Sequence, residues 1–219
     1  YELKPLIFFL RRNGYLNIYP FIYPEKHGQV SIEVLGSRLK EFVDRIEEKP
    51  PFCIIGLCQG GIIAKYYIEK LGGYEKISKC ITIGSPHSGS LTAYLKSAEG
   101  ISQLRPKSPL LKELSKLLKK NSVKKGHTKY YAIWAPFDLI VFPGYSAYLK
   151  EAVVNKPTFA PAHWMMFWWP STFRFIIRSI SDDGSGSYFN NNRTIFKPPV
   201  ITKQINFIKQ INIPFVKLR

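Results

Sequence analysis

Cys58 lies in a sequence pattern that favours nucleophilic chemistry. Residues 56–61 read Gly-Leu-Cys-Gln-Gly-Gly, directly after the apolar run 52–55 and directly before a helix-favouring segment. An apolar strand, a glycine-rich turn and a helix in this order are typical of a nucleophile elbow, in which serine is the usual central residue. Gly56 and Gly60 have no Cβ, so we expect strand and helix to approach closely while Cys58 adopts a strained backbone conformation. The alternative is a glycine-rich turn that holds an inert, buried cysteine.

The position of Cys58 at the start of the expected helix bears on its reactivity. The free N–H groups and the dipole of a helix N-terminus favour negative charge. A cysteine that is also close to a histidine can react as the thiolate. The pattern therefore predicts a thiol nucleophile if a histidine lies nearby in the fold.

Composition narrows the possible partners. The chain has 219 residues, a net charge of +17 and 45% hydrophobic residues, enough for one compact domain with a sizeable core. The positive charge would attract anionic lipid surfaces, but the lysines are scattered and no basic-aromatic motif indicates nucleic-acid binding. No Cys/His spacing suggests a metal, and we expect no cofactor. Cys53 and Cys80 border apolar runs, so we expect buried free thiols.

Alternating strand and helix patterns predict an α/β fold with a parallel sheet. A helix is expected over Glu2–Arg12, another follows the potential N-cap Ser31, and a third covers Pro170–Ser181. The elbow helix should end near Gly72. The expected strands are Tyr15–Tyr19, Phe52–Gly56, Ile77–Ile83 and Tyr130–Trp134.

Two segments stand apart from this alternation. Residues 88–129 form a lid-like insertion that contains an amphipathic helix over Ser108–Lys120. That helix could be a cationic lid that contacts a membrane or lipid interface, or an ordinary surface helix packed on the domain. Residues 1–181 are expected to form the domain itself, and residues 182–219 a flexible linker followed by a peripheral hairpin or a disordered tail.

Four blocks of sequence resemble the lipase/esterase branch of the α/β-hydrolase superfamily, particularly bacterial triacylglycerol lipases. Ile54–Gly73 resembles the elbow and its helix, and Gly84–Ser90 (Gly-Ser-Pro-His-Ser-Gly-Ser) resembles a loop that follows the next strand. Arg105–Leu111 resembles a stretch near the lid, and Ile133–Ala147 resembles the segment that carries the catalytic acid. The resemblance implies an α/β-hydrolase fold, a mainly parallel sheet with helices on both faces.

The resemblance also implies catalytic roles, because hydrolases of this fold present nucleophile, acid and histidine in that order. Cys58 would be the nucleophile, Asp138 the acid and His163 the base. The alternative for Asp138 is a turn-capping carboxylate. His87 would organise the loop near the site, whereas His127 is expected to be solvated, as is His27.

The oxyanion hole is where the sequence departs from the family pattern. The backbone N–H of Gln59 would supply one donor. In the family a second donor comes from a His-Gly-type loop after an earlier strand, and no such loop precedes the helix expected over Glu2–Arg12. We therefore expect the sheet of this chain to lack its first strands.

Three functions follow from these features. The first is a lipase/esterase-like hydrolase of lipid-type carboxylic esters, acting through a Cys-His-Asp triad and an acyl-enzyme. The second is a Cys-dependent acyltransferase, since polyhydroxyalkanoate synthases have a similar G-x-C-x-G-G box and dienelactone hydrolases a related cysteine elbow. The third is a catalytically degenerate hydrolase fold.

Overall fold

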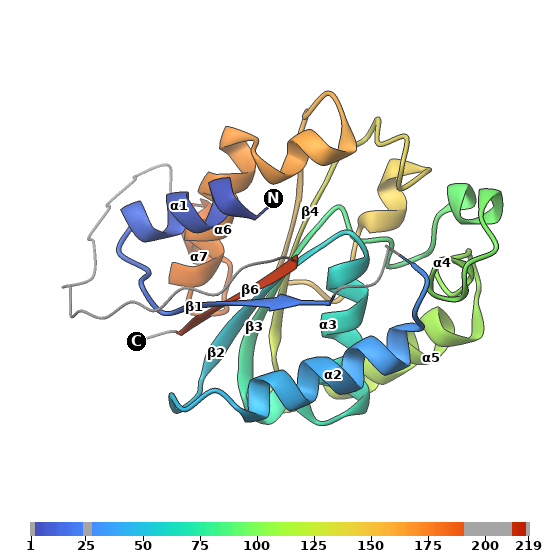
Figure 1. The fold of residues 1–219 in the computed structure, drawn as a ribbon. Coiled ribbons are helices and arrows are strands. Elements are labelled where there is room, and N and C mark those ends of the chain that lie inside the picture. The colour runs from blue at the N-terminus through green and yellow to red at the C-terminus, as the bar shows by residue number, and fades with distance from the viewer. Residues whose placement is uncertain (1–2, 24–27, 191–211, 218–219) are drawn as a thin grey trace.

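A six-stranded sheet with helices on both faces forms the protein (Figure 1). The computed structural model describes residues 3–23 and 28–190, and the backbone of residues 212–217. The strand order is β1-β6-β2-β3-β4-β5. The strands are β1 (Ile18–Ile22), β2 (Phe52–Leu57), β3 (Ile77–Ile83), β4 (Lys129–Trp134), β5 (Val154–Pro157) and β6 (Asn212–Lys217).

Five of these strands run in the same direction. β2, β3, β4 and β5 pair in parallel. β6 is antiparallel to both β1 and β2, so β1 runs parallel to β2. The mainly parallel α/β sheet expected from the sequence is therefore confirmed.

The helices cover the sheet in two layers (Figure 1). α2 (Ile32–Asp44), α3 (Gln59–Lys70) and α5 (Pro109–Asn121) cover one face, and α1 (Lys4–Arg12), α6 (Pro170–Ser181) and α7 (Ser187–Asn190) cover the other. The short helices of the connecting segments are η1 (Gly73–Glu75), η2 (Leu91–Leu95), α4 (Glu99–Ser102), η3 (Gly144–Ala147) and η4 (His163–Phe167).

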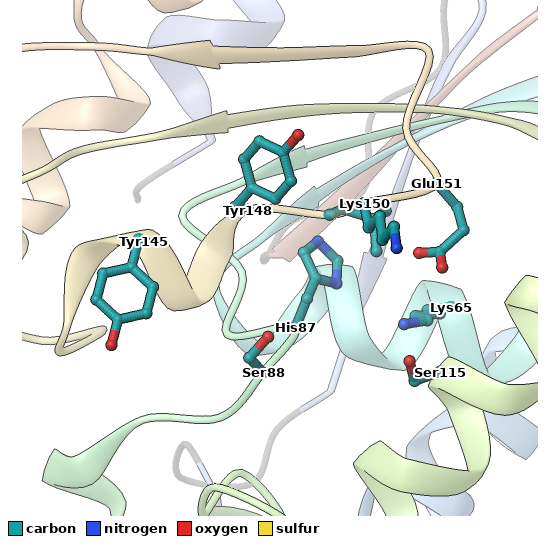
Figure 2. Close-up of a pocket in the computed structure, with 9 residues that line it drawn as sticks. Lys65, His87, Ser88, Ser115, Tyr145, Tyr148, Lys150 and Glu151 are labelled. Carbon is teal, nitrogen blue, oxygen red and sulfur yellow. The ribbon is translucent and has the colours of Figure 1, made fainter.

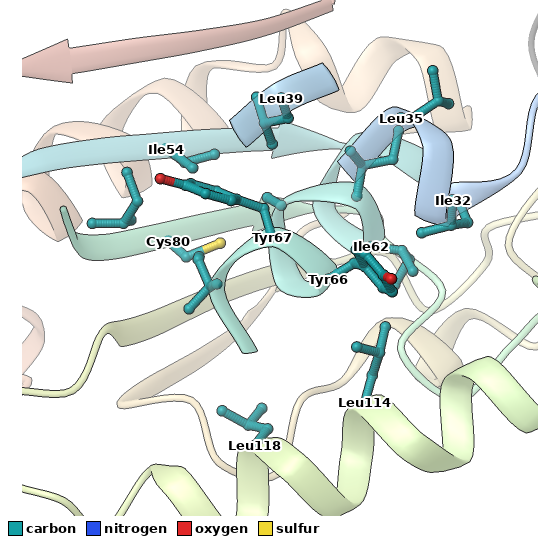
Figure 3. Close-up of a cluster of buried hydrophobic side chains, with 14 of the residues drawn as sticks. Ile32, Leu35, Leu39, Ile54, Ile62, Tyr66, Tyr67, Cys80, Leu114 and Leu118 are labelled. Atoms are coloured by element: carbon teal, nitrogen blue, oxygen red, sulfur yellow. The ribbon is translucent and has the colours of Figure 1, made fainter. Parts of the chain in front are cut away.

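β2 contributes side chains to a hydrophobic core on each face of the sheet. Phe52 and Ile54 pack with the helices α2, α3 and α5, whereas Ile55 and Leu57 pack with α1 and α6. Figure 3 shows part of the first core, where side chains of α2 and α5 approach those of α3. Because both faces are covered, the strand is a continuous apolar run rather than an alternating one.

The helix α5 packs on the domain. Oγ of Ser108 caps it by accepting a hydrogen bond from the N–H of Leu111 at 3.3 Å. Its buried leucines join the core beside α3, while the side chains of Lys112, Lys116, Lys119 and Lys120 are exposed. In this structure α5 is thus a surface helix with a buried apolar face and a cationic outer face.

Residues 182–190 are held against the sheet, which differs from the flexible linker expected there. The buried carboxylate of Asp182 accepts hydrogen bonds from the hydroxyl of Tyr131 at 2.7 Å and from the N–H groups of Gly184 and Gly186. Phe189 packs beside the rings of Tyr131 and Phe175. Asp182, the first residue of the expected linker, thus accepts hydrogen bonds that hold the following residues against β4.

The strand β6 also differs from the expected peripheral or disordered tail. It lies inside the sheet and pairs with β1 on one side and β2 on the other. Its backbone thereby provides partners for the facing edges of both strands. Residues 191–211 of the same tail lie outside the described residues.

Candidate active site

Cys58 occupies the sharp turn between β2 and α3. Its backbone has φ 50° and ψ −119°, a region that non-glycine residues rarely adopt. A Cβ on Gly56 would lie 2.5 Å from Cα of Gly61, so the strand and the helix can meet only without side chains here. The sequence suggested Gly60 as the glycine that Gly56 approaches. In the structure Gly61 comes closest, and Gly60 contributes its carbonyl carbon. A strand, a residue at positive φ and a helix thus follow one another directly at Cys58.

Asp138 lies in the turn that follows β4 and uses its two carboxylate oxygens differently. Oδ1 accepts hydrogen bonds from the N–H groups of Ile140 and Val141 at 2.8 and 2.9 Å. Oδ2 accepts a hydrogen bond from Nδ1 of His163 at 2.5 Å. The two sequence-based interpretations of Asp138, turn cap and histidine partner, therefore hold together in one buried side chain.

His163 begins η4 and is buried beside Asp138 and Cys58. Burial alone would lower the pKa of His163, but Asp138 and Cys58 outweigh it and raise that pKa to about 10. Nε2 of His163 is buried and has no hydrogen-bond partner among the residues that the structure describes. His163 is therefore hydrogen-bonded to Asp138, whereas Cys58 raises the pKa of the imidazole without a well-aligned hydrogen bond to Nε2.

Gly84 lies directly against the imidazole of His163, a contact that the sequence pattern did not indicate. Its φ is +54°, and a Cβ there would lie 3.0 Å from Cε1 of His163 and 3.3 Å from the sulfur of Met166. Its N–H donates to the carbonyl of Ile133 at the end of β4. A glycine at the start of the Gly84–Ser90 block was visible in the sequence. Only the fold shows that the side chain of His163 packs against it.

The same block fixes the turn that carries the acid. Oγ of Ser90 accepts a hydrogen bond from the N–H of Phe142 at 2.9 Å and lies 3.0 Å from the carbonyl oxygen of Ile140. The N–H of Ser88 donates to the carbonyl of Ser146 at 2.9 Å. These contacts tie the loop after β3 to the turn after β4.

His87 takes no part in the Asp138–His163 pair. It is buried, and its Nε2 lies 3.0 Å from Oγ1 of Thr82 on β3. Burial, helped by the nearby charge of Lys65, keeps the pKa of His87 well below its usual value, so the ring is neutral. His87 is thus a buried, neutral side chain that contacts Thr82 on β3.

Gln59, His127 and His27 are the remaining residues for which the sequence predicted a role or a surrounding. Gln59 is the first residue of α3, so its N–H belongs to the helical turn whose N–H groups lack intrahelical partners. His127 is buried and its Nε2 lies 3.0 Å from Oε1 of Glu69, so the expectation of a solvated histidine was wrong. His27 lies outside the described residues.

The part of the chain that the structure describes shows no group of three or more His, Cys, Asp or Glu side chains that could hold a metal ion. No described helix is long and apolar enough to cross a membrane. Cys53 and Cys80 are buried free thiols, and burial raises the pKa of Cys53 to about 12.

Similarity to solved structures supports the α/β-hydrolase fold of this chain. The sequence model for palmitoyl protein thioesterase matches residues 24–151, more than half of the chain. The protein therefore belongs to the palmitoyl protein thioesterase family. No curated protein sequence matches the chain.

Three solved structures illustrate the similarity of fold. The mature lipase BlEst2 of Bacillus licheniformis is 18% identical with a TM-score of 0.50, over 71% of this chain and 75% of the lipase. The product of gene lin2722 of Listeria innocua is 15% identical with a TM-score of 0.51, over 72% and 70% of the two chains. Phospholipase PlaB of Legionella pneumophila, in complex with thio-NAD, is 14% identical with a TM-score of 0.52, over 61% of this chain and 34% of that one.

Membership of this family confirms the expected relationship to lipases and esterases and makes the protein an ester hydrolase of the lipase, esterase and thioesterase type.

Proposed function

We propose that this protein hydrolyses lipid-type acyl esters or thioesters through Cys58, His163 and Asp138, with an acyl-enzyme on Cys58. The observation that carries the proposal is the buried hydrogen bond of 2.5 Å between Asp138 and His163, beside a cysteine in the strained elbow conformation. Nucleophile, base and orienting acid in this relation form the arrangement used for acyl transfer.

The first half of the reaction forms a thioester. His163, whose pKa Asp138 and Cys58 raise to about 10, holds the proton while Cys58 attacks as the thiolate. The sulfur bonds to the acyl carbonyl carbon, the bond to the leaving group breaks, and His163 gives its proton to the departing alkoxide or thiolate. Asp138 keeps Nδ1 of His163 protonated, so that Nε2 is the nitrogen that faces the reaction.

The second half returns the enzyme to its starting state. Water adds to the thioester carbonyl and loses a proton to Nε2 of His163, the carbon–sulfur bond breaks, and the carboxylic acid leaves. In both halves the N–H of Gln59 would donate to the oxyanion at the N-terminus of α3. The free N–H groups of this helix end also favour the thiolate.

Exposed apolar side chains around the site support a lipid-type acyl group. In the sequence they occur close to Asp138, close to His163 and directly after the Gly84–Ser90 loop. Large exposed apolar patches on soluble proteins mark binding sites for ligands, proteins or membranes. These side chains are Leu91, Tyr94, Leu95, Phe137, Leu139, Ile140, Phe159 and Trp164. A surface of this kind could bind an acyl chain or touch a lipid interface, and the lipase and phospholipase among the similar structures fit such substrates.

The test compares ester hydrolysis by the wild type with that by two variants at Cys58. We expect hydrolysis of p-nitrophenyl esters, faster for a long acyl chain than for acetyl, and its loss in Cys58→Ala. Cys58→Ser separates the roles, since a serine hydroxyl can replace the thiol if the elbow and His163 are intact. The wild type should also show, by mass spectrometry, an acyl adduct on the peptide that contains Cys58.

Alkylation provides a matched control, because Cys53 and Cys80 are buried whereas Cys58 is partly accessible. Iodoacetamide should modify Cys58 first and remove activity in step with that modification. Full activity after alkylation of Cys58, or equal activity of Cys58→Ala, would refute the proposal. A folded wild type that hydrolyses no ester or thioester would support the degenerate alternative.

The cysteine itself favours one second candidate, an acyltransferase. A thioester intermediate can be attacked by an alcohol as well as by water, which serves acyl transfer as readily as hydrolysis. Adding an acceptor alcohol to the assay distinguishes the two. An ester product that exceeds the free acid at modest alcohol concentration would indicate a transferase, and release of free acid alone would exclude it.

A further inference from the structure

A polar cavity lies apart from the proposed catalytic residues, between α3, α5 and the segment 145–151 (Figure 2). Its volume is about 340 Å³, which is within the range of small-molecule sites. None of Cys58, Asp138 and His163 lines it. Six of the side chains that line it carry charged, imidazole or hydroxyl groups: Lys65, His87, Ser88, Ser115, Lys150 and Glu151.

Lys65 brings a buried positive charge to this cavity. The residue lies on α3, is only 1% exposed, and makes no hydrogen bond or ion pair within the described parts of the chain. Burial lowers the pKa of Lys65 to about 8, against the opposing effect of Glu151 and Glu69, so the amine is still mainly protonated at neutral pH. Burying an unpaired ammonium group is costly, and the cost falls if an anion comes next to it.

The neighbouring acidic side chains leave this charge without a direct partner. Glu69, one turn further along α3, already accepts hydrogen bonds from His127, Asn121 and Tyr130. Glu151 faces the same cavity in Figure 2 but forms no salt bridge with Lys65. The space between them is where a ligand group could lie.

His87 adds a second unused polar group. It is 5% exposed, and its Nδ1 has no hydrogen-bond partner in the described structure. Nε2 lies 3.0 Å from the hydroxyl of Thr82, which donates to it when it does not donate to the more distant carbonyl of Tyr131 at 3.4 Å. In that tautomer Nδ1 carries the proton and can donate a hydrogen bond to an oxygen in the cavity. Figure 2 shows the imidazole directed into the space that Lys65 also faces.

We propose that this cavity binds a small carboxylate, whose oxygens contact the ammonium group of Lys65 and Nδ1 of His87. The hydroxyls of Ser88 and Ser115 supply further polar contacts at its edge. Lys65, Lys150 and Glu151 together leave one net positive charge, which a monoanion would neutralise. A phosphate dianion would bring excess negative charge close to Glu151 and should bind more weakly.

The experiment measures thermal unfolding of the wild-type protein with acetate, glycerate or inorganic phosphate, each against sodium chloride at equal ionic strength. Acetamide serves as the uncharged analogue of acetate. A carboxylate present at a hundredfold excess over its Kd should raise Tm by roughly 5 °C or more. Acetamide should leave Tm at the value measured in sodium chloride alone.

Two variants with the same chemical change locate the effect. Lys65→Met removes the buried charge and should abolish the carboxylate-dependent shift. Lys116→Met removes an exposed lysine of α5 outside the cavity and should keep the shift. A carboxylate-dependent shift that persists in Lys65→Met, or an equal shift with acetamide, would overturn the proposal.

Calorimetric titration of the wild type with acetate keeps the proposal testable if Lys65→Met fails to fold. Because binding needs a protonated Lys65, affinity should fall at least tenfold between pH 7 and pH 10. No measurable heat at millimolar acetate, or affinity that does not change over this range, would count against the site. Neither measurement depends on Cys58, so the outcome is separate from that of the proposed catalytic function.

Discussion

Replacing Asp138 with asparagine tests the proposed site with little change of shape. Oδ1 of the new side chain can still accept the hydrogen bonds from Ile140 and Val141 that hold the turn. The group that meets Nδ1 of His163 changes from a charged oxygen to an amide NH2. Since an NH2 group can only donate, Nδ1 must become the acceptor, and the proton moves to Nε2.

The move of the His163 proton from Nδ1 to Nε2 should remove most of the catalytic rate. The neutral imidazole then carries its proton on the nitrogen that must accept one, and the pKa of His163 falls because its charged partner is gone. The corresponding change in Ser-His-Asp triads lowers kcat about 10⁴-fold. For a nucleophile that reacts as the thiolate we expect a loss of about 10³- to 10⁴-fold, equivalent to about 4 to 5 kcal/mol.

The assay measures kcat with a chromogenic ester and, independently, the rate of alkylation of Cys58 as a function of pH. In Asp138→Asn we expect slower alkylation near neutral pH, because less imidazolium is present to stabilise the thiolate. Asp183→Asn is the matched control, because Asp183 is exposed and its carboxylate accepts hydrogen bonds from Ser185, away from His163. A folded Asp138→Asn enzyme with kcat within about threefold of the wild type would refute the assigned role.

Four further predictions concern the support of the site and the fold. Gly84→Ala should lower kcat at least tenfold, because the new Cβ lies 3.0 Å from the ring of His163. Gly56→Ala should destabilise the fold by about 1 to 3 kcal/mol or more in urea unfolding, since its Cβ would meet Gly61 at 2.5 Å. Leu114→Ala should cost about 2 to 5 kcal/mol in the same measurement. The raised pKa of His163 predicts stability that is fully present below about pH 6.5 and is lost as pH rises through about 10, which unfolding at several pH values measures.

Matched substitutions separate the causes in these predictions. Gly126→Ala also places alanine at a positive φ, +80°, but its Cβ would meet nothing within 4 Å, so it should strain the backbone without lowering kcat. Val123→Ala shortens an exposed side chain and should change stability by less than about 0.5 kcal/mol. If Gly84→Ala and Gly126→Ala affected kcat equally, contact with His163 would not be the reason.

Local sequence patterns were enough for two elements that follow Cys58 in the chain. The expected strand Ile77–Ile83 and helix Pro170–Ser181 have those bounds in the structure. The first strand differs, since it is Ile18–Ile22 rather than the expected Tyr15–Tyr19, and it includes Pro20, a residue type that strand patterns disfavour. The pairing of Pro20 with Pro214 on β6 explains how the strand includes it, and that pairing spans most of the chain.

The candidate site could be predicted only as far as chain order allows. The order of Cys58, Asp138 and His163 and the fold implied by the resemblance indicated that these residues could meet, and the structure brings them together. The support of the imidazole by Gly84 and the polar cavity at Lys65 depend on three-dimensional contacts. No local spacing in the sequence encodes such contacts, so they could not be predicted.

The dual use of Asp138 couples the position of His163 to the turn after β4, which the Gly84–Ser90 loop also contacts. The carboxylate that orients His163 also caps its own turn, so the turn cannot loosen without releasing the imidazole. Ser90 holds the same turn by its contacts with Ile140 and Phe142, and Gly84, six residues earlier, lies against the ring of His163. The loop therefore fixes the imidazole from two sides, directly through Gly84 and indirectly through the turn of Asp138. Such support holds the imidazole in position before a substrate binds.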